Sequence, residues 1–163
     1  MRDYRPIGAT HIPVLIKAVH MSTGPILELG SGPFSTALLH SLAIDMDREL
    51  ITYENGRSYY ERYSNMQGGN HKVFFVDDWD KLDISYKHWG VALVDHSPDT
   101  RRRIEIKKLA NCADYIVAHD SDEKNDEKYH KYSEIYPLFK YHYDYKKQVP
   151  NTVVLSNKYK YEN

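Results

Sequence analysis

Short runs of apolar residues alternate along this chain with stretches whose apolar residues have helical spacing. In one such stretch, Phe34, Ala37, Leu38 and Leu42 fall on one face of a helix. The apolar runs contain few polar residues, which is typical of strands that are buried on both faces of a parallel sheet. We therefore predict five such strands, at 25–29, 49–53, 73–76, 91–94 and 115–118.

Helices are predicted around these strands, and the chain changes character after the fifth strand. The helical stretches are 12–19, 34–42, 59–63, 99–111 and the highly charged segment 121–134. The segments 138–145 and 152–156 read as a terminal antiparallel pair. Neither a repeat nor a Pro- or Gly/Ser-rich linker divides residues 1–163. The prediction is a single α/β domain: a doubly wound, Rossmann-like, mostly parallel sheet with a C-terminal antiparallel strand pair and helices on both faces.

Candidate chemistry gathers where the predicted strands end. The first strand runs into the glycine turn Gly30-Ser31-Gly32. The other four end on acids, namely Glu54, Asp77 with Asp78, Asp95, and Asp120. Open α/β sheets bind ligands beyond the carboxyl ends of their strands, near the point where the strand order reverses. We expect a ligand site there.

The glycine turn is an incomplete dinucleotide fingerprint. Ser35 stands where that pattern requires a third glycine. Glu28 precedes the turn, and an acid there would repel a pyrophosphate. Glu54 follows the turn by about 20 residues, the spacing of an acid that binds ribose hydroxyls. The two acids together favour an adenosine that carries a positive group.

The stretch Ile26-Leu27-Glu28-Leu29-Gly30-Ser31-Gly32-Pro33-Phe34-Ser35-Thr36 resembles motif I of class I S-adenosylmethionine-dependent methyltransferases, in the variant with Ser-Thr after the glycine turn. The resemblance covers about 24–120, with a cofactor half at 24–96 and an acceptor side at 1–20 and 95–163. It departs at Phe34, where many members keep a third glycine.

The resemblance implies S-adenosylmethionine as the cofactor and assigns residues to it. Gly30, Ser31 and Gly32 would approach the cofactor closely, and Glu28 would lie near its methionine ammonium. Glu54 would hold the ribose. The adenine side would be formed by Asp77, Asp78 and Trp79, and Asp95 would be the fourth-strand acid of the cofactor site.

The implied reaction is methyl transfer, which we expect to be O-methylation of a small-molecule or sugar hydroxyl. Asp95, His96 and His119 are the candidate catalytic residues, and either histidine could be the general base. Metal-dependent O-methyltransferases carry carboxylates at these strand ends, so Asp95 and Asp120 could bind a divalent cation such as Mg²⁺. Their usual third ligand, an Asn, is missing because Ser121 stands there.

Two other functions stay open. One is a non-catalytic S-adenosylmethionine-binding module that needs a partner chain. The other is a nucleic-acid methyltransferase, because Asp95-His96-Ser97-Pro98 resembles the Asp/Asn-Pro-Pro-aromatic motif of nucleobase amino-methyltransferases, although the second proline and the aromatic residue are absent. The arginines at 101–103 could grip an anionic acceptor or pair with nearby acids on a solvated helix face.

Charge and composition limit the classes of partner and the compartment that we expect for this chain. With 22 Lys and Arg against 23 Asp and Glu, the formal net charge is -1, which disfavours nucleic acid. No apolar run approaches the ~20 residues that span a membrane, and Met1–Pro6 lacks the apolar region of a secretory signal. The single cysteine, Cys112, excludes an internal disulfide and fits a reducing compartment. We expect a cytoplasmic protein with a small-molecule acceptor and no membrane partner.

Tyrosine is unusually frequent, with 15 residues that concentrate toward the C-terminus. The tyrosines within 129–136 have the spacing of one helical stripe, and those within 141–145 alternate along a strand. They could pack against the sheet, line an acceptor pocket, stack nucleobases or form the surface of a homodimer, since tyrosine is enriched at interfaces.

Overall fold

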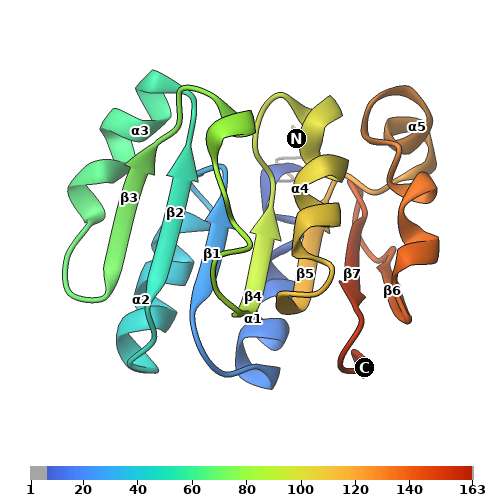
Figure 1. Cartoon of the computed structure of the whole chain (residues 1–163), viewed down its shortest axis with the longest axis horizontal. Helices are drawn as coiled ribbons and strands as arrows, with labels where there is room; N and C mark the ends of the chain where they lie inside the picture. The colour runs from blue at the N-terminus through green and yellow to red at the C-terminus, as the bar shows by residue number, and fades with distance from the viewer. Residues whose placement is uncertain (1–6, 163) are drawn as a thin grey trace, which may run out of the picture.

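The computed structural model describes residues 7–162, so the expectation drawn from Met1–Pro6 lies outside the described residues. The described chain forms a seven-stranded sheet with the order β3-β2-β1-β4-β5-β7-β6 (Figure 1). The strands are β1 (Ile26–Leu29), β2 (Leu50–Glu54), β3 (His71–Phe75), β4 (Trp89–Val94), β5 (Ala113–His119), β6 (Tyr141–Tyr145) and β7 (Thr152–Ser156).

The predicted topology is confirmed. The first five strands pair in parallel, while β7 runs antiparallel between β5 and β6. The strand order reverses between β1 and β4, because β2 and β3 extend the sheet to one side of β1 and the later strands extend it to the other. A crevice at that reversal is where open α/β sheets bind ligands.

The helices cover both faces of the sheet. They are α1 (Ile12–Met21), α2 (Thr36–Asp45), α3 (Arg57–Tyr63), α4 (Arg102–Leu109) and the single turn α5 (Glu123–Asn125). In Figure 1, α4 lies on the face toward the viewer, and α1 and α2 lie behind the sheet. No helix in residues 7–162 is long and apolar enough to cross a membrane.

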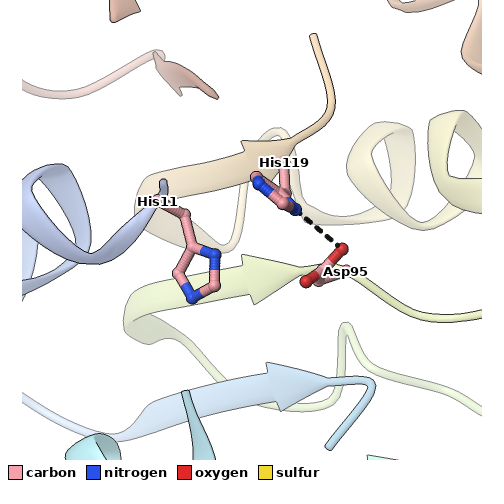
Figure 2. Close-up of side chains that lie close together, drawn as sticks. All are labelled: His11, Asp95 and His119. Atoms are coloured by element: carbon pink, nitrogen blue, oxygen red, sulfur yellow. Dashed lines mark hydrogen bonds and ion pairs between the residues drawn. The ribbon is translucent and has the colours of Figure 1, made fainter. Parts of the chain in front are cut away.

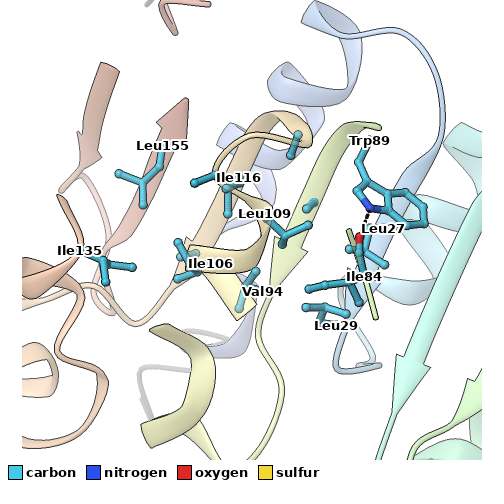
Figure 3. Close-up of a cluster of buried hydrophobic side chains, with 14 of the residues drawn as sticks. Leu27, Leu29, Ile84, Trp89, Val94, Ile106, Leu109, Ile116, Ile135 and Leu155 are labelled. Carbon is cyan, nitrogen blue, oxygen red and sulfur yellow. Dashed lines mark hydrogen bonds between the residues drawn. The ribbon is translucent and has the colours of Figure 1, made fainter. Parts of the chain in front are cut away.

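Side-chain alternation along the strands divides the core into two clusters. Leu27 and Leu29 point into the cluster beneath α4, together with Ile106 and Leu109 of that helix (Figure 3). Ile26, which precedes Leu27 and points to the opposite face, belongs to the second cluster, which α1 and α2 cover. Successive strand residues point to opposite faces, so burial on both faces explains why the strands are apolar throughout.

The charged segment 121–134 is not the continuous helix that its sequence predicts. After α5 it forms a π-helical turn at Asp126–His130, and Lys131 adopts a left-handed conformation with φ 55°. The carboxylate of Asp126 accepts backbone N–H groups of Tyr132 and Ser133. This side chain satisfies donors that a continuous helix would bond internally, and the chain turns there into short 3-10 segments at Tyr132–Glu134 and Tyr136–Leu138.

The C-terminal tyrosines have different surroundings. Tyr132 is fully buried beneath α4, whereas Tyr129 is more than one-third exposed, so the tyrosines of 129–136 do not share one buried stripe. Tyr143 and Tyr145 point the same way along β6 and pack, partly buried, against the cluster that α1 and α2 cover. Core packing is thus the observed setting of Tyr132, Tyr136, Tyr143 and Tyr145. The homodimer surface stays a prediction.

Candidate functional site

A cavity of about 390 Å³ opens at the carboxyl ends of β1, β2 and β4, within the size range of small-ligand sites. Its wall is formed by the glycine turn, by the ends of β2 and β4, and by residues that precede or begin α1 and α3. The lining residues are Gly8, His11, Gly30, Ser31, Gly32, Pro33, Phe34, Ser35, Glu54, Tyr59, Asp95, His96 and Ser97.

The glycine turn is built for close packing between β1 and β4. Gly30 has φ +91°, and a Cβ there would lie 2.7 Å from the backbone of Asp95 and His96. Only glycine combines this left-handed conformation with that approach. The turn therefore brings the end of β1 directly against the loop after β4, and both line the cavity.

The backbone N–H groups of the turn already have acceptors within the protein. Gly30 donates to the carbonyl of Tyr53 at 2.9 Å. Ser31 donates to the Glu54 carboxylate at 2.6 Å, and Gly32 donates to the Thr36 hydroxyl at 2.9 Å. A loop in this state offers these three donors to no anion, unlike the phosphate-binding loops that expose theirs.

Glu54, the acid assigned to the ribose, lines the cavity at the end of β2. Oε2 accepts the N–H and hydroxyl of Ser31, and Oε1 accepts the N–H of Gly56 at 2.5 Å. A carboxylate has about four lone-pair sites, so one remains for a ligand hydroxyl. The ribose role of Glu54 stays a prediction. In the structure its carboxylate also joins the loop after β1 to the loop after β2.

Glu28, assigned to the methionine ammonium, faces away from the cavity. It has no exposed surface, and it alternates with Leu27 and Leu29 so that it points toward α2. Its carboxylate accepts the hydroxyls of Thr36 and Thr52 at 3.0 and 2.7 Å. Burial raises the pKa of Glu28 to about 7 despite these hydrogen bonds. Direct contact with a ligand's ammonium does not fit this geometry.

A hydrogen-bonded chain continues from Glu28 toward the surface. The Thr52 hydroxyl donates to Glu28, so it must accept from Nε2 of His71, 3.0 Å away. Nδ1 of His71 lies 3.0 Å from Nδ1 of His40 on α2. Burial and the nearby His40 lower the pKa of His71 to about 4. A neutral His71 accepts at Nδ1, so His40 is the donor.

The residues assigned to the adenine side lie outside the cavity wall. Asp77 and Asp78 line a separate shallow hollow after β3. Trp79 is buried, its ring centroid lies 4.3 Å from that of His96, and its indole N–H donates to the carbonyl of Ser97 at 3.0 Å. Trp79 thus supports the loop after β4 from behind, because its apolar ring is needed in the core beneath α4.

Arg102 occupies the position predicted for a metal ion. Its guanidinium forms ion pairs of 3.0 Å with both Asp95 and Asp120. One buried cation is therefore already paired with both carboxylates that the sequence suggested as ligands. The predicted Mg²⁺ site at Asp95 and Asp120 is not supported, because arginine's fixed fork holds both acids at the same time.

Both ring nitrogens of His119 face acceptors within the protein. The Thr10 hydroxyl donates to the carbonyl of Pro150 at 2.7 Å, so toward His119 Nε2, 2.8 Å away, it can only accept. On the other side, Nδ1 faces the carboxylates of Asp95 and Asp120 at 3.3 and 3.5 Å. Burial would lower its pKa, but these two acids outweigh burial and raise it.

These contacts argue against the expected role of His119. Its ring nitrogens face Thr10 and the two carboxylates, so neither is free to accept a proton from a substrate, and the role of general base does not fit His119 in this network. Atoms of His11, Asp95 and His119 lie within 4.8 Å of one another, but Nδ1 of His119 is turned to Asp95 and Asp120 and pairs with them. Arg102 and His119 also keep the pKa of Asp95 below its usual value against the effect of burial.

His96 differs from His119. It lines the cavity and is buried, and its Nε2 faces the Glu105 carboxylate at 3.2 Å. Burial lowers the pKa of His96, so the ring is neutral with its hydrogen on Nε2. Nδ1 then holds a lone pair that has no partner among the described residues. This arrangement, a base oriented by a carboxylate, is that of a general base.

The three arginines after β4 are all paired with acids. Arg101 contacts Asp80 and Glu105. Arg103 pairs with Glu134 at the surface. Together with the pairs of Arg102, these contacts favour the reading in which the arginines bind protein acids, and none of the three lines the cavity.

His11 is one of the cavity residues that the sequence did not reveal. It directly precedes α1, is 1% exposed, and contacts the ring of His119 edge-on with centroids 4.9 Å apart (Figure 2). Both of its ring nitrogens lack a partner among the described residues. A lone histidine before a helix carries no motif and no periodic signal, so only the fold brings it to the ends of β4 and β5.

Neither a protein-family model nor a curated protein sequence matches the chain. Solved structures do match it. A methyltransferase from Pyrococcus furiosus superposes with a TM-score of 0.61 at 12% identity, covering 96% of this chain and 88% of its own. The N-methyltransferase NodS from Bradyrhizobium japonicum WM9 has a TM-score of 0.61 at 11% identity, with 94% and 96% covered.

A third match includes a bound ligand. TrmK of M. capricolum, in complex with S-adenosylhomocysteine, the natural cofactor product, superposes with a TM-score of 0.51 at 11% identity, covering 92% of this chain and 70% of its own. Identities this low establish the architecture and leave the substrate open. The chain has the Rossmann-like fold of the class I S-adenosylmethionine-dependent methyltransferases.

Proposed function

We propose that this chain is an S-adenosylmethionine-dependent methyltransferase that methylates a hydroxyl of a small molecule or sugar. The observation that carries the proposal is the charge of the cavity wall. Two carboxylates, Glu54 and Asp95, line the cavity, and its lining contains no lysine or arginine among the described residues. Such a wall favours a ligand with positive groups, and the sulfonium and ammonium of S-adenosylmethionine provide two.

The residues present fit this cofactor. Glu54 keeps one lone-pair site for a ribose hydroxyl, and Asp95 accepts toward the cavity at the end of β4. The cofactor supplies an activated methyl group when bound. The chain's own contribution is to align the acceptor and to remove its proton.

His96 is the residue that we assign to this proton transfer. Methylation of a hydroxyl releases one proton, and Nδ1 of His96 is neutral, buried and free to accept it. The Glu105 carboxylate then stabilises the imidazolium that forms, since it already faces Nε2 at 3.2 Å. Asp95, paired with Arg102 and His119, positions the acceptor and the cofactor.

The acceptor is best matched by an uncharged molecule. Arg101, Arg102 and Arg103 are paired with protein acids, so they provide no free cation for a phosphate or a carboxylate of an acceptor. Near-zero net charge likewise gives no general attraction for nucleic acid. We still expect the protein in the cytoplasm, because a chain with a single cysteine fits a reducing compartment.

Calorimetric titration with S-adenosylhomocysteine tests the cofactor, and transfer of labelled methyl groups tests the reaction. We expect saturable binding, and label in a base-stable ether product when small-molecule fractions are offered. Label in RNA would favour the nucleic-acid alternative. Binding without transfer to any pool would favour the non-catalytic module. Absence of binding at millimolar ligand would remove both the enzyme and the module.

A further inference from the structure

His11 is the buried histidine, among those described, with no hydrogen-bond partner on either ring nitrogen. It does not cap α1, because its side chain makes no capping hydrogen bond. Figure 2 shows its ring beside Asp95 and His119, where the ends of β4 and β5 meet the start of α1. Buried polar groups in native proteins almost always have partners, so a ring left without one in a cavity wall indicates a ligand.

Buried side-chain donors with a free hydrogen are scarce in the cavity wall. The N–H groups of the glycine turn are bonded within the protein. The Ser31 hydroxyl donates to Glu54, and that of Ser35 bonds to Glu28. His96 gives its hydrogen to Glu105. Among the buried side chains of the described wall, His11 alone keeps an N–H that is free to donate.

The electrostatic surroundings of His11 suit a carboxylate. Its ring touches that of His119, which is buried and whose pKa is raised, against the effect of burial, by Asp95 and Asp120. Polar atoms of His11 and Asp95 lie within 4.8 Å of each other, so a donor and an anionic acceptor stand side by side. An α-amino acid presents the complementary pair, a carboxylate and an ammonium carried on one carbon atom.

We propose that His11 and Asp95 together bind the amino-acid end of S-adenosylmethionine, with His11 donating its N–H to the ligand's carboxylate and Asp95 accepting from its ammonium. This inference rests on the proposed function. Glu28, which the resemblance placed near the methionine ammonium, points toward α2 instead. In its place the proposal uses Asp95 for the ammonium and His11, which lies outside the stretch that resembles the family, for the carboxylate. Burial and the adjacent His119 charge lower the pKa of His11 to about 4, so the free protein holds a neutral ring with one N–H.

Decarboxylated S-adenosylmethionine isolates this contact, because it lacks the carboxylate and keeps the ammonium, sulfonium and adenosine. Calorimetry would compare both ligands with the unmodified chain and with His11→Phe. We expect the unmodified chain to prefer the complete ligand by about tenfold or more, since hydrogen bonds to charged groups are strong. His11→Phe should bind the two ligands within about threefold of each other.

The design contains its own controls. Decarboxylated ligand should bind His11→Phe about as well as the unmodified chain, which also shows that the variant is folded. His11→Gln, which keeps an N–H donor, should retain part of the preference. His20→Phe, an exposed histidine in the last turn of α1, should retain all of it.

Two results would overturn the inference. One is equal affinity of the unmodified chain for both ligands, which needs no variant. The other is a His11→Phe variant that still prefers the complete ligand as strongly as the unmodified chain. Failure of both ligands to bind the unmodified chain would instead contradict the proposed function, so the two failures are distinguishable.

Discussion

The guanidinium of Arg102 lies 3.0 Å from the carboxylate of Asp95, at the point where β4 ends in the cavity wall. The same side chain reaches Asp120 after β5, and its Nε donates to the carbonyl of His96 at 2.8 Å. One buried arginine of α4 thus holds the carboxyl ends of two neighbouring strands. The position of Asp95 in the cavity depends on this contact.

Replacing Arg102 with methionine should destabilise the protein by about 3 kcal/mol, at the lower end of the range for buried pairs, because two partly buried carboxylates lose their buried cation. Urea unfolding followed by circular dichroism measures the change. The matched control is Arg103→Met, since Arg103 is the next residue of α4 and its pair with Glu134 is exposed. That variant should lose at most about 1 kcal/mol. Equal losses in the two variants would contradict the structural role of Arg102.

Divalent cations should leave the cavity unaffected, because Arg102 takes the place between Asp95 and Asp120. We expect Mg²⁺ at about 10 mM, above the dissociation constants of weak protein sites, to change neither the thermal midpoint nor the affinity for S-adenosylhomocysteine. EDTA should be equally without effect. A midpoint that rises with Mg²⁺ and falls again with EDTA would restore the metal hypothesis.

Glu54→Gln should weaken S-adenosylhomocysteine binding by about 1–3 kcal/mol, through loss of charged hydrogen bonds to the ribose and a looser turn at Ser31. Adenosine carries the same ribose, so its affinity should fall in parallel, and calorimetry measures both. The control is Glu49→Gln, because Glu49 directly precedes β2 at its opposite end and pairs with Lys87. An unchanged affinity in Glu54→Gln would remove Glu54 from the cofactor site.

His96→Gln should reduce methyl transfer by about 10²–10⁴-fold, the usual contribution of a general base. Binding of S-adenosylhomocysteine should stay within about threefold, which separates proton transfer from cofactor affinity. The labelled-methyl assay and calorimetry provide the two readouts. His20→Gln, on the exposed side of α1, is the control. Transfer that persists in His96→Gln would assign the proton to another group.

Much of the fold could be predicted because parallel strands buried on both faces leave a plain apolar signature. The runs that became β1, β4 and β5 lie within one or two residues of their predicted positions, and the terminal pair was visible as well. That signature says nothing about which face each residue takes. Glu28 sits within a strand buried on both sides, so its sequence position could not show that it points toward α2.

Contacts between distant parts of the chain were the least predictable. Arg102 meets Asp95 and Asp120 only because α4 folds back across the ends of β4 and β5. His11 lies near Asp95 in the folded chain, and no rule of sequence spacing links the two residues. The prediction of a continuous helix at 121–134 was wrong for a local reason. The Asp126 side chain competes for backbone donors that a helix would need.

The raised pKa of Glu28 should make the stability of the protein depend on pH. Its folded pKa, raised to about 7 by burial, exceeds its ordinary value of 4.5. Between these values the folded state binds a proton that the unfolded state has released. The contribution of Glu28 to stability is therefore fully present below pH 4.5 and is lost as the pH rises through 7, at about 1.4 kcal/mol per pH unit between the two values.

Glu28→Gln should remove this dependence, because a neutral amide cannot titrate against the Thr36 and Thr52 hydroxyls. Relative to the unmodified protein, the variant should gain stability as the pH rises from about 4.5 to 7, and the difference should level off above 7. Urea unfolding at several pH values measures the slope, whatever constant offset the amide introduces. Glu61→Gln, at an exposed acid of α3, should show no such slope. Parallel pH profiles for Glu28→Gln and the unmodified protein would mean that Glu28 keeps an ordinary pKa, and that solvent or a mobile α2 relieves its burial.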